Sequence, residues 1–246
     1  MDWEYDSDTC TLVGETPKEQ TLMASFDIGY RHLAYYVESI HLDDALGICN
    51  VPKARRYRED GATTDEFQRV LDQLAAAGRM VELDCVDISD GCDNSGALDP
   101  QTLHNLTEFL DSKSDLFSQC TVFVIEEQFR GGGFGRGRAK AGSQNTKAIR
   151  IQHHLESYVY INYPDAVVKP FPSRHKTQVI GCPKARNTDS KRKVWAVHAF
   201  RDMLITLENY EMLKFLEDFP RKRDDISDVF LQLLAFKYLA IVDGRI

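Results

Sequence analysis

The sequence lacks the features that mark membrane and secreted proteins. No apolar stretch reaches the roughly 18 residues needed to span a bilayer, and no secretory apolar segment is present. The six cysteines form no CxxC pair and have no histidine at zinc-finger spacing, which favours free thiols in a reducing compartment. The acidic N-terminus is unlike a basic organellar transit peptide. We therefore expect an intracellular protein that is neither secreted nor bound to a membrane.

The chain also lacks the positive charge of a protein that coats DNA along its whole length. Its net charge is -8 at pH 7. Basic residues are nevertheless clustered: six lie from Arg130 to Arg150 without an acid, and eight lie from Lys169 to Lys193 against Asp189 alone. Two basic segments in an acidic protein indicate a polyanion that binds at one face.

No internal repeat is visible, and the length suits one large domain. Residues 1–20 carry an excess of acids and no apolar period, so we expect a flexible acidic tail there. The domain would then cover residues 21–243, with insertions near 43–78 and 129–144. The second insertion is rich in glycine, which is unfavourable in a helix or strand, so we expect an irregular loop there.

Apolar runs and alternation predict strands at 22–28, 33–40, 79–88, 121–126 and 166–171. Helical spacing predicts helices at 65–77, 100–116, 145–160, 191–207 and about 224–241. Asp99 is expected to cap the second of these, with Pro100 at its first position. Strands that meander first and then alternate with helices indicate an α/β fold, with a mixed five-stranded sheet flanked by helices.

Four acidic residues adjoin apolar segments that lie far apart in the chain. Asp27 is in the first predicted strand, Glu126 ends the fourth, and Asp225 and Asp228 open the last helix. A buried carboxylate is unfavourable unless it is paired or binds a metal. Collected at one place, the four would form an oxygen-donor site for Mg²⁺ or Mn²⁺, with two ions for phosphodiester hydrolysis.

Each acid also has a simpler structural explanation. Asp27 can cap the glycine turn that follows it, and acids at the start of the last helix suit the helix dipole. Glu126 and Glu127 are alternatives for the second acid of the site. We favour Glu126, because it continues the strand on the face of Val124. Asp224 lies four residues before Asp228, whereas Asp225 lies three before it, and we favour Asp225.

The basic segments supply the candidate contacts to DNA. Lys191 and Lys193 lie in the first turn of a predicted helix, where positive charge opposes the helix dipole and suggests a phosphate, although the lysines could instead be only solvated. In the glycine-rich loop, Phe134 or Phe129 could stack on bases, although the loop could instead only aid solubility. The residues assigned to DNA binding are Arg130, Phe134, Arg136, Arg138, Lys140, Lys176 and Arg192.

Three ordered motifs resemble one nuclease family. Ser-Phe-Asp-Ile-Gly at 25–29 with Leu-Ala-Tyr at 33–35 resembles the first strand of the RuvC-like Holliday junction resolvases, particularly the poxvirus and yeast mitochondrial enzymes. Val-Ile-Glu-Glu-Gln-Phe at 124–129 is similar to the strand that carries their second acid. The basic run and aspartates at 221–228 resemble the poxvirus pattern.

This resemblance implies an RNase H-like fold, a homodimer and metal-dependent cleavage of four-way DNA junctions. It would make Asp27, Glu126, Asp225 and Asp228 the metal-binding acids. A family lysine near the site would map to Lys191, Arg192 or Lys193, and the three remain alternatives. The poxvirus likeness suggests a virus-encoded protein that acts at a cytoplasmic replication site, while a nuclear or organellar origin stays open.

Other functions fit less of the sequence. A sugar kinase or actin-like ATPase needs a second glycine-rich phosphate loop and an adenosine motif, and neither is found. A proofreading exonuclease usually has Asp and Glu two apart in its first strand, whereas Asp27 is followed by Gly29. A silent DNA-binding protein would not need the acids. A nuclease for RNA·DNA hybrids or for flap or branched DNA remains the main alternative.

Overall fold

The computed structural model describes residues 4–6, 11–13, 20–92, 97–128, 146–186, 188–218 and 222–245. Its centre is a five-stranded sheet in the order β5-β4-β3-β6-β7. The first three strands form an antiparallel meander, and β6 and β7 add in parallel beside β3. The mixed α/β sheet expected from the sequence is therefore confirmed. Its strands are β3 (Gln20–Ile28), β4 (His32–His41), β5 (Gly78–Asp87), β6 (Cys120–Glu127) and β7 (Val167–Pro172).

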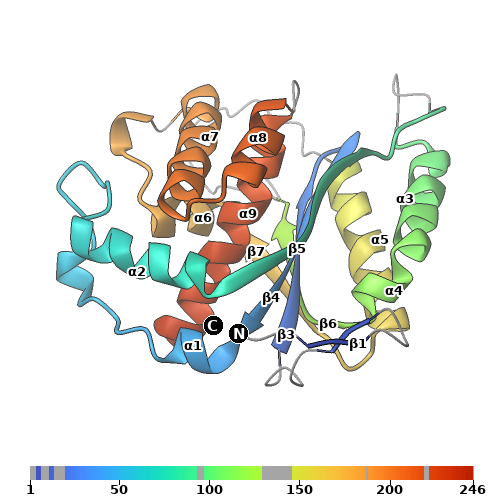
Figure 1. Cartoon of the computed structure of the whole chain (residues 1–246). Helices are drawn as coiled ribbons and strands as arrows, with labels where there is room; N and C mark the ends of the chain where they lie inside the picture. The colour runs from blue at the N-terminus through green and yellow to red at the C-terminus, as the bar shows by residue number, and fades with distance from the viewer. Residues whose placement is uncertain are drawn as a thin grey trace, which may run out of the picture.

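Helices cover both faces of the sheet (Figure 1). One layer contains α2 (Asp65–Ala76), α6 (Ser173–Ile180), α7 (Asp189–Thr206), α8 (Tyr210–Asp218) and α9 (Arg223–Lys237). The other contains α3 (Pro100–Ser112), α4 (Ser114–Phe117) and α5 (Thr146–Asn162). Strand alternation sends Phe123 and Ile125 into the core under α5, and Val124 into the core under α9.

A tight turn joins β3 to β4 and places Asp27 at the end of the sheet. The Gly29 N–H donates to the His32 carbonyl at 2.9 Å. A Cβ at Gly29 would lie 2.8 Å from that same oxygen, so a larger residue would push the turn apart. This turn fixes where β3 stops, one residue after Asp27.

A buried ion pair anchors the far end of α9 against β4. Lys237 Nζ lies 2.5 Å from Glu38 Oε1, and the two side chains are 1% and 2% exposed. The Tyr36 hydroxyl donates to the other carboxylate oxygen at 2.8 Å. This pair joins the C-terminal half of α9 to β4, and both buried charges have partners.

Several local expectations differ from the structure. The helix expected over 100–116 is divided at Lys113 into α3 and α4, although the Asp99 cap and Pro100 start are confirmed. Asp224 and Asp225 do not cap the last helix, because α9 begins at Arg223 after Lys222, which has a positive φ of 70°. The last turns, Tyr238–Val242, are π-helical. Elements that were not expected are β1 (Glu4–Asp6) paired with β2 (Thr11–Val13), α1 (Leu42–Leu46), α6, α8 and the short helices Lys53–Arg55 and Lys184–Arg186.

Candidate active site

Two of the acids meet at the carboxyl ends of neighbouring parallel strands. The register pairs Phe26 of β3 with Ile125 of β6, so Asp27 and Glu126 follow at the same level. The charge of Glu126 acts on Asp27 and helps to raise the Asp27 pKa, as expected for two carboxyl groups that lie close together. Glu127 points to the other side of the strand and is exposed. The geometry therefore brings Glu126, and not Glu127, to Asp27.

Helix α9 carries the other two acids to the same end of the sheet. Asp225 and Asp228 are three residues apart and share a face of the helix. Both lie close enough to Asp27 to interact with it electrostatically. The charge of Asp225 helps raise the Asp27 pKa, and the charge of Asp27 helps raise the Asp228 pKa. Asp224 pairs with Lys193 at 2.5 Å, and its charge also helps to raise the Asp228 pKa.

A buried lysine lies among these acids. Lys176 is 4% exposed, and its Nζ is 2.9 Å from Asp228 Oδ2. Burial alone would lower the Lys176 pKa, but the charges of Asp228, Asp27 and Glu126 outweigh it and raise that pKa. The sequence assigned Lys176 to a DNA-facing surface, and the structure instead places it inside the acid group.

The helix that carries Lys176 was missed because its residues 173–180 follow a proline-rich strand. One signal was present: Gly181 ends α6 with a positive φ of 81°, the left-handed conformation in which helices commonly end. An apolar pair at Val179 and Ile180, just before that glycine, packs into the core. Together these two signs would have predicted a short helix.

The surroundings of Asp27 and Asp228 do not fully stabilise a negative charge on either side chain. Burial, followed by the charge of Glu126, raises the Asp27 pKa well above its usual value. Burial also raises the pKa of Asp228, even though Lys176 acts to lower it. Four carboxylates against one buried ammonium leave a demand for further positive charge at this end of the sheet.

The donor set fits a hard divalent cation. It consists of carboxylate oxygens, which Mg²⁺ and Mn²⁺ prefer, and the raised carboxyl pKa values show that added positive charge would be stabilising. Within the described ranges, no three His, Cys, Asp or Glu side chains already stand close enough to form a complete metal site. Ion binding would therefore require the carboxylates to move closer together.

Gln128 holds the Glu126 carboxylate from the end of β6. Its Nε2 donates to Glu126 Oε2 at 2.8 Å and to the Ile28 carbonyl at 3.2 Å. Its backbone N–H donates to Oε1 of Gln152, a buried residue of α5. Gln128 thus joins β6, β3 and α5 beside the acids, a role that no sequence pattern indicated.

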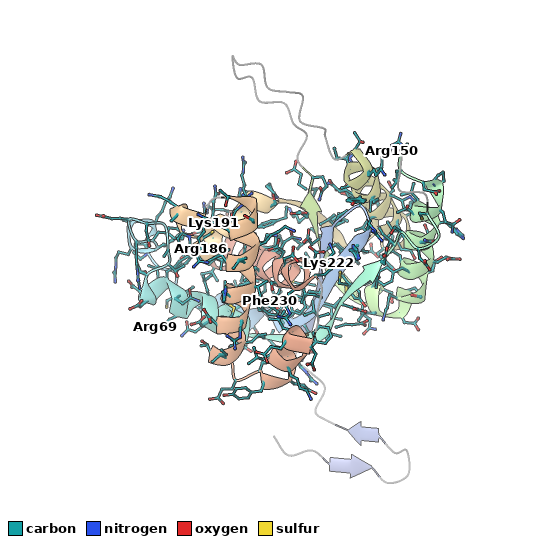
Figure 2. All side chains as sticks on the ribbon, turned by 90° about the horizontal axis from the view of Figure 1, so that it is seen from above. Arg69, Arg150, Arg186, Lys191, Lys222 and Phe230 are labelled. Carbon is teal, nitrogen blue, oxygen red and sulfur yellow. The ribbon has the colours of Figure 1, made fainter. Side chains whose placement is uncertain are left out.

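Basic residues form the rim of the site. A groove of about 500 Å³ is lined by Lys193, Val194, Val197, Lys222, Arg223 and Asp224. Lys222 Nζ is 3.0 Å from Asp225 Oδ2, so the rim and the acids are directly joined. Seen from above, Lys222 lies between the helical layers, Lys191 lies on the α7 side and Arg150 lies at α5 (Figure 2).

The three candidates near the start of α7 differ in position. Lys193 pairs with Asp224, and the hydrogen bond to that carboxylate is the main reason that its pKa is raised. Lys191 is exposed and Arg192 is partly buried. Five other assigned residues lie outside the described residues: Arg130, Phe134, Arg136, Arg138 and Lys140.

The fold matches those of two solved enzymes. A fowlpox virus resolvase bound to its substrate Holliday junction DNA matches with a TM-score of 0.50 and 13% identity, covering 90% of this chain and 99% of that one. The yeast mitochondrial Holliday junction resolvase matches with a TM-score of 0.52 and 13% identity, covering 91% of this chain and 81% of that one. The chain has the fold of the RuvC-like Holliday junction resolvases. This confirms the RNase H-like architecture implied by the three motifs.

Sequence comparison relates the chain to viral proteins. An uncharacterized protein, 170L of Invertebrate iridescent virus 6, is 26% identical over 264 residues, covering 93% of this chain and 94% of its own. No family model matches the sequence. In the part of the chain that the structure describes, no helix has the length and apolar character to cross a bilayer.

Proposed function

We propose that the protein is a metal-dependent endonuclease that resolves four-way DNA junctions by paired phosphodiester hydrolysis. One observation supports this most directly: Asp27, Glu126 and Asp228 act on the buried Lys176, Asp225 acts on Asp27, and a groove with basic residues lies beside them. A site that only recognised DNA would gain nothing from acids whose charge repels the backbone. The likeness of the fold to Holliday junction resolvases favours this substrate over others.

In this proposal Asp27, Glu126, Asp225 and Asp228 hold two Mg²⁺ or Mn²⁺ ions. When bound, such ions lower the pKa of a water molecule and stabilise the oxygen that leaves the phosphorus. The residues of the chain fix the geometry. Gln128 orients the Glu126 carboxylate, and the paired strand ends set its separation from Asp27.

Lys176 supplies fixed positive charge in this scheme. Since its pKa is raised above the usual value, it stays protonated at neutral pH and cannot accept a proton from water. It orients Asp228 through their contact and stabilises negative charge that develops on a phosphate. Lys193 and Lys222 at the rim would hold the phosphates next to the cut. Lys191 and Arg192, near the start of α7, would bind the DNA arms.

Paired cuts require two sites, so we propose that two copies of the chain act together. The end of α5 has two large exposed side chains, Tyr160 and Ile161, at 57% and 77%, and such residues are common in interfaces between subunits. Light scattering on the protein with and without a junction tests this. A single copy on each cut junction would contradict it. The iridescent virus relative supports a viral origin for the protein.

The test is cleavage of a labelled synthetic four-way junction with Mg²⁺, compared with a DNA duplex and an RNA·DNA hybrid of the same sequence. We expect symmetrical nicks in the junction alone. Cutting of the hybrid but not of the junction would instead identify the alternative, a hybrid nuclease of the same fold. Cutting of neither would remove the proposal.

Three variants examine the site itself. Asp27→Asn and Asp228→Asn should abolish cutting and leave junction binding intact, because each keeps the size of the side chain and removes its charge. Glu127→Gln is the matched control, since Glu127 adjoins Glu126 but is exposed on the other side of the strand. Normal cutting by either aspartate variant would exclude that residue from the site.

A further inference from the structure

A buried glutamine joins the three elements that carry the acids. Gln232 of α9 has no exposed surface. Its Nε2 donates to the Phe26 carbonyl at 3.0 Å, to Ser25 Oγ at 3.1 Å and to the Val124 carbonyl at 3.4 Å. The two carbonyls can only accept hydrogen bonds, so the amide nitrogen must face the strands. One side chain therefore holds β3, β6 and α9 together.

The position of Gln232 relates directly to the acids. Gln232 follows Asp225 by seven residues and Asp228 by four, so all three lie on the same face of α9. On the strands, its partners Ser25 and Val124 each lie two residues before an acid, Asp27 and Glu126.

Helix and strand spacings match across this contact. Four helical residues advance about 6 Å, and two strand residues advance about 6.6 Å. A hydrogen bond from Gln232 to the level of Ser25 therefore sets Asp228 at the level of Asp27. A slip of α9 by one turn would break the bond and separate the two acids.

Packing alone does not account for a glutamine here. Gln232 Oε1 is buried and has no hydrogen-bond partner among the described residues, which is unfavourable in a core. A leucine or methionine would fill similar space without an unsatisfied oxygen. The benefit of the glutamine must therefore come from the Nε2 contacts to the strand ends.

We propose that Gln232 is a positioning residue that sets the spacing between the acids of the strands and the acids of α9, and so the affinity of the site for divalent metal. This rests on the proposed function, because it assumes that the four acids bind metal. Groups that orient metal ligands typically change affinity about 10- to 100-fold when they are removed. Gln232 acts through the backbone that carries the ligands and does not touch the metal.

The test compares Gln232→Met with Leu234→Ala. Methionine keeps the length and loses the donor, while Leu234 is similarly buried on the same helix and its side chain cannot form a hydrogen bond. Mn²⁺ binding to the free protein is measured by calorimetry, stability by thermal unfolding, and junction cutting as a function of Mg²⁺. We expect Gln232→Met to bind Mn²⁺ about tenfold more weakly or worse and to need more Mg²⁺ for half-maximal cutting, while junction affinity without metal is unchanged. Leu234→Ala should lose thermal stability and keep its Mn²⁺ affinity.

Unchanged Mn²⁺ affinity in Gln232→Met, or an equal loss of affinity in Leu234→Ala, would mean that Gln232 has only a packing role and would overturn the inference. A wild-type protein that binds no Mn²⁺ would overturn it as well. If Gln232→Met does not fold, Gln232→His takes its place: it keeps one N–H donor, and its affinity should fall by roughly threefold. A wild-type protein that binds Mn²⁺ but leaves junctions uncut would refute the junction substrate. The Mn²⁺ comparison would still decide the role of Gln232.

Discussion

Removing the buried Lys176 ammonium should destabilise the metal-free protein strongly. Breaking a buried ion pair by loss of one partner typically costs about 3 to 5 kcal/mol. The Asp228 side chain is 23% exposed and regains some hydration, so the lower end, about 3 kcal/mol, applies to Lys176→Met. For a chain of this size that is a decrease in melting temperature of about 6 to 12 °C.

The loss should depend on pH in a definite direction. The raised Lys176 pKa means that its contribution is complete below the ordinary lysine value of 10.5 and is lost only above it, so it is intact at pH 8. Asp27 and Asp228 have raised pKa values, so protonation stabilises their folded forms as pH falls below those values. Lys176→Met should therefore be most destabilising near pH 8 and less so near pH 4, because the raised pKa values of Asp27 and Asp228 favour their neutral forms as the pH falls.

Urea unfolding of the wild type, Lys176→Met, Asp228→Asn and the double variant at both pH values measures this. The double variant should recover much of the loss, because no unpaired charge is left beside the lysine position. A pH-independent loss, or a double variant as unstable as Lys176→Met, would show that the lysine acts by packing. The electrostatic account of the site would then be wrong.

Three further changes test the scaffold by urea unfolding. Lys237→Met leaves Glu38 buried without its partner and should lower the free energy of unfolding by about 3 to 5 kcal/mol. Adding Glu38→Gln to this variant should restore part of the loss. If Lys237→Met loses no stability, the pair does not hold α9. Gly181→Ala should lower the free energy of unfolding more than Gly91→Ala does. Both glycines have a positive φ, and the resulting strain on alanine is about 1 to 2 kcal/mol, but only at Gly181 would the Cβ lie 2.7 Å from Thr63. Equal losses in the two variants would refute the steric contribution. Asp99→Ala should cost about 1 kcal/mol through loss of the cap on α3, with exposed Asp115 as a control that should change stability little.

The strands and the acids could be predicted because their signals are local. Each sheet strand shows alternation or an apolar run over its own residues, and Asp27 and Glu126 interrupt such runs visibly. The choice of Glu126 over Glu127 followed from strand alternation alone, and the structure brings Glu126 to Asp27. The metal and DNA roles of these residues stay predictions.

Lys176 and Gln232 could not be placed from the sequence because their partners are distant in the chain. Lys176 reads as one more member of a basic segment until α6 turns it inward to Asp228. Gln232 is a polar residue in an apolar helix, and its partners are about 100 and 200 residues away. Such side chains acquire their roles from tertiary contacts, which no local period encodes.

Because α9 follows β3 and β6 in the chain, a truncated product can keep the strand acids and lose those of the helix. A nascent chain released or cleaved before Arg223 contains β3 and β6 but neither aspartate of α9 nor Gln232. Such a product lacks half of the acids and the contact that aligns the rest. Under the proposed function, a product that ends before Arg223 would be unable to cut DNA, because the acids of β3 and β6 would lack their partners on α9.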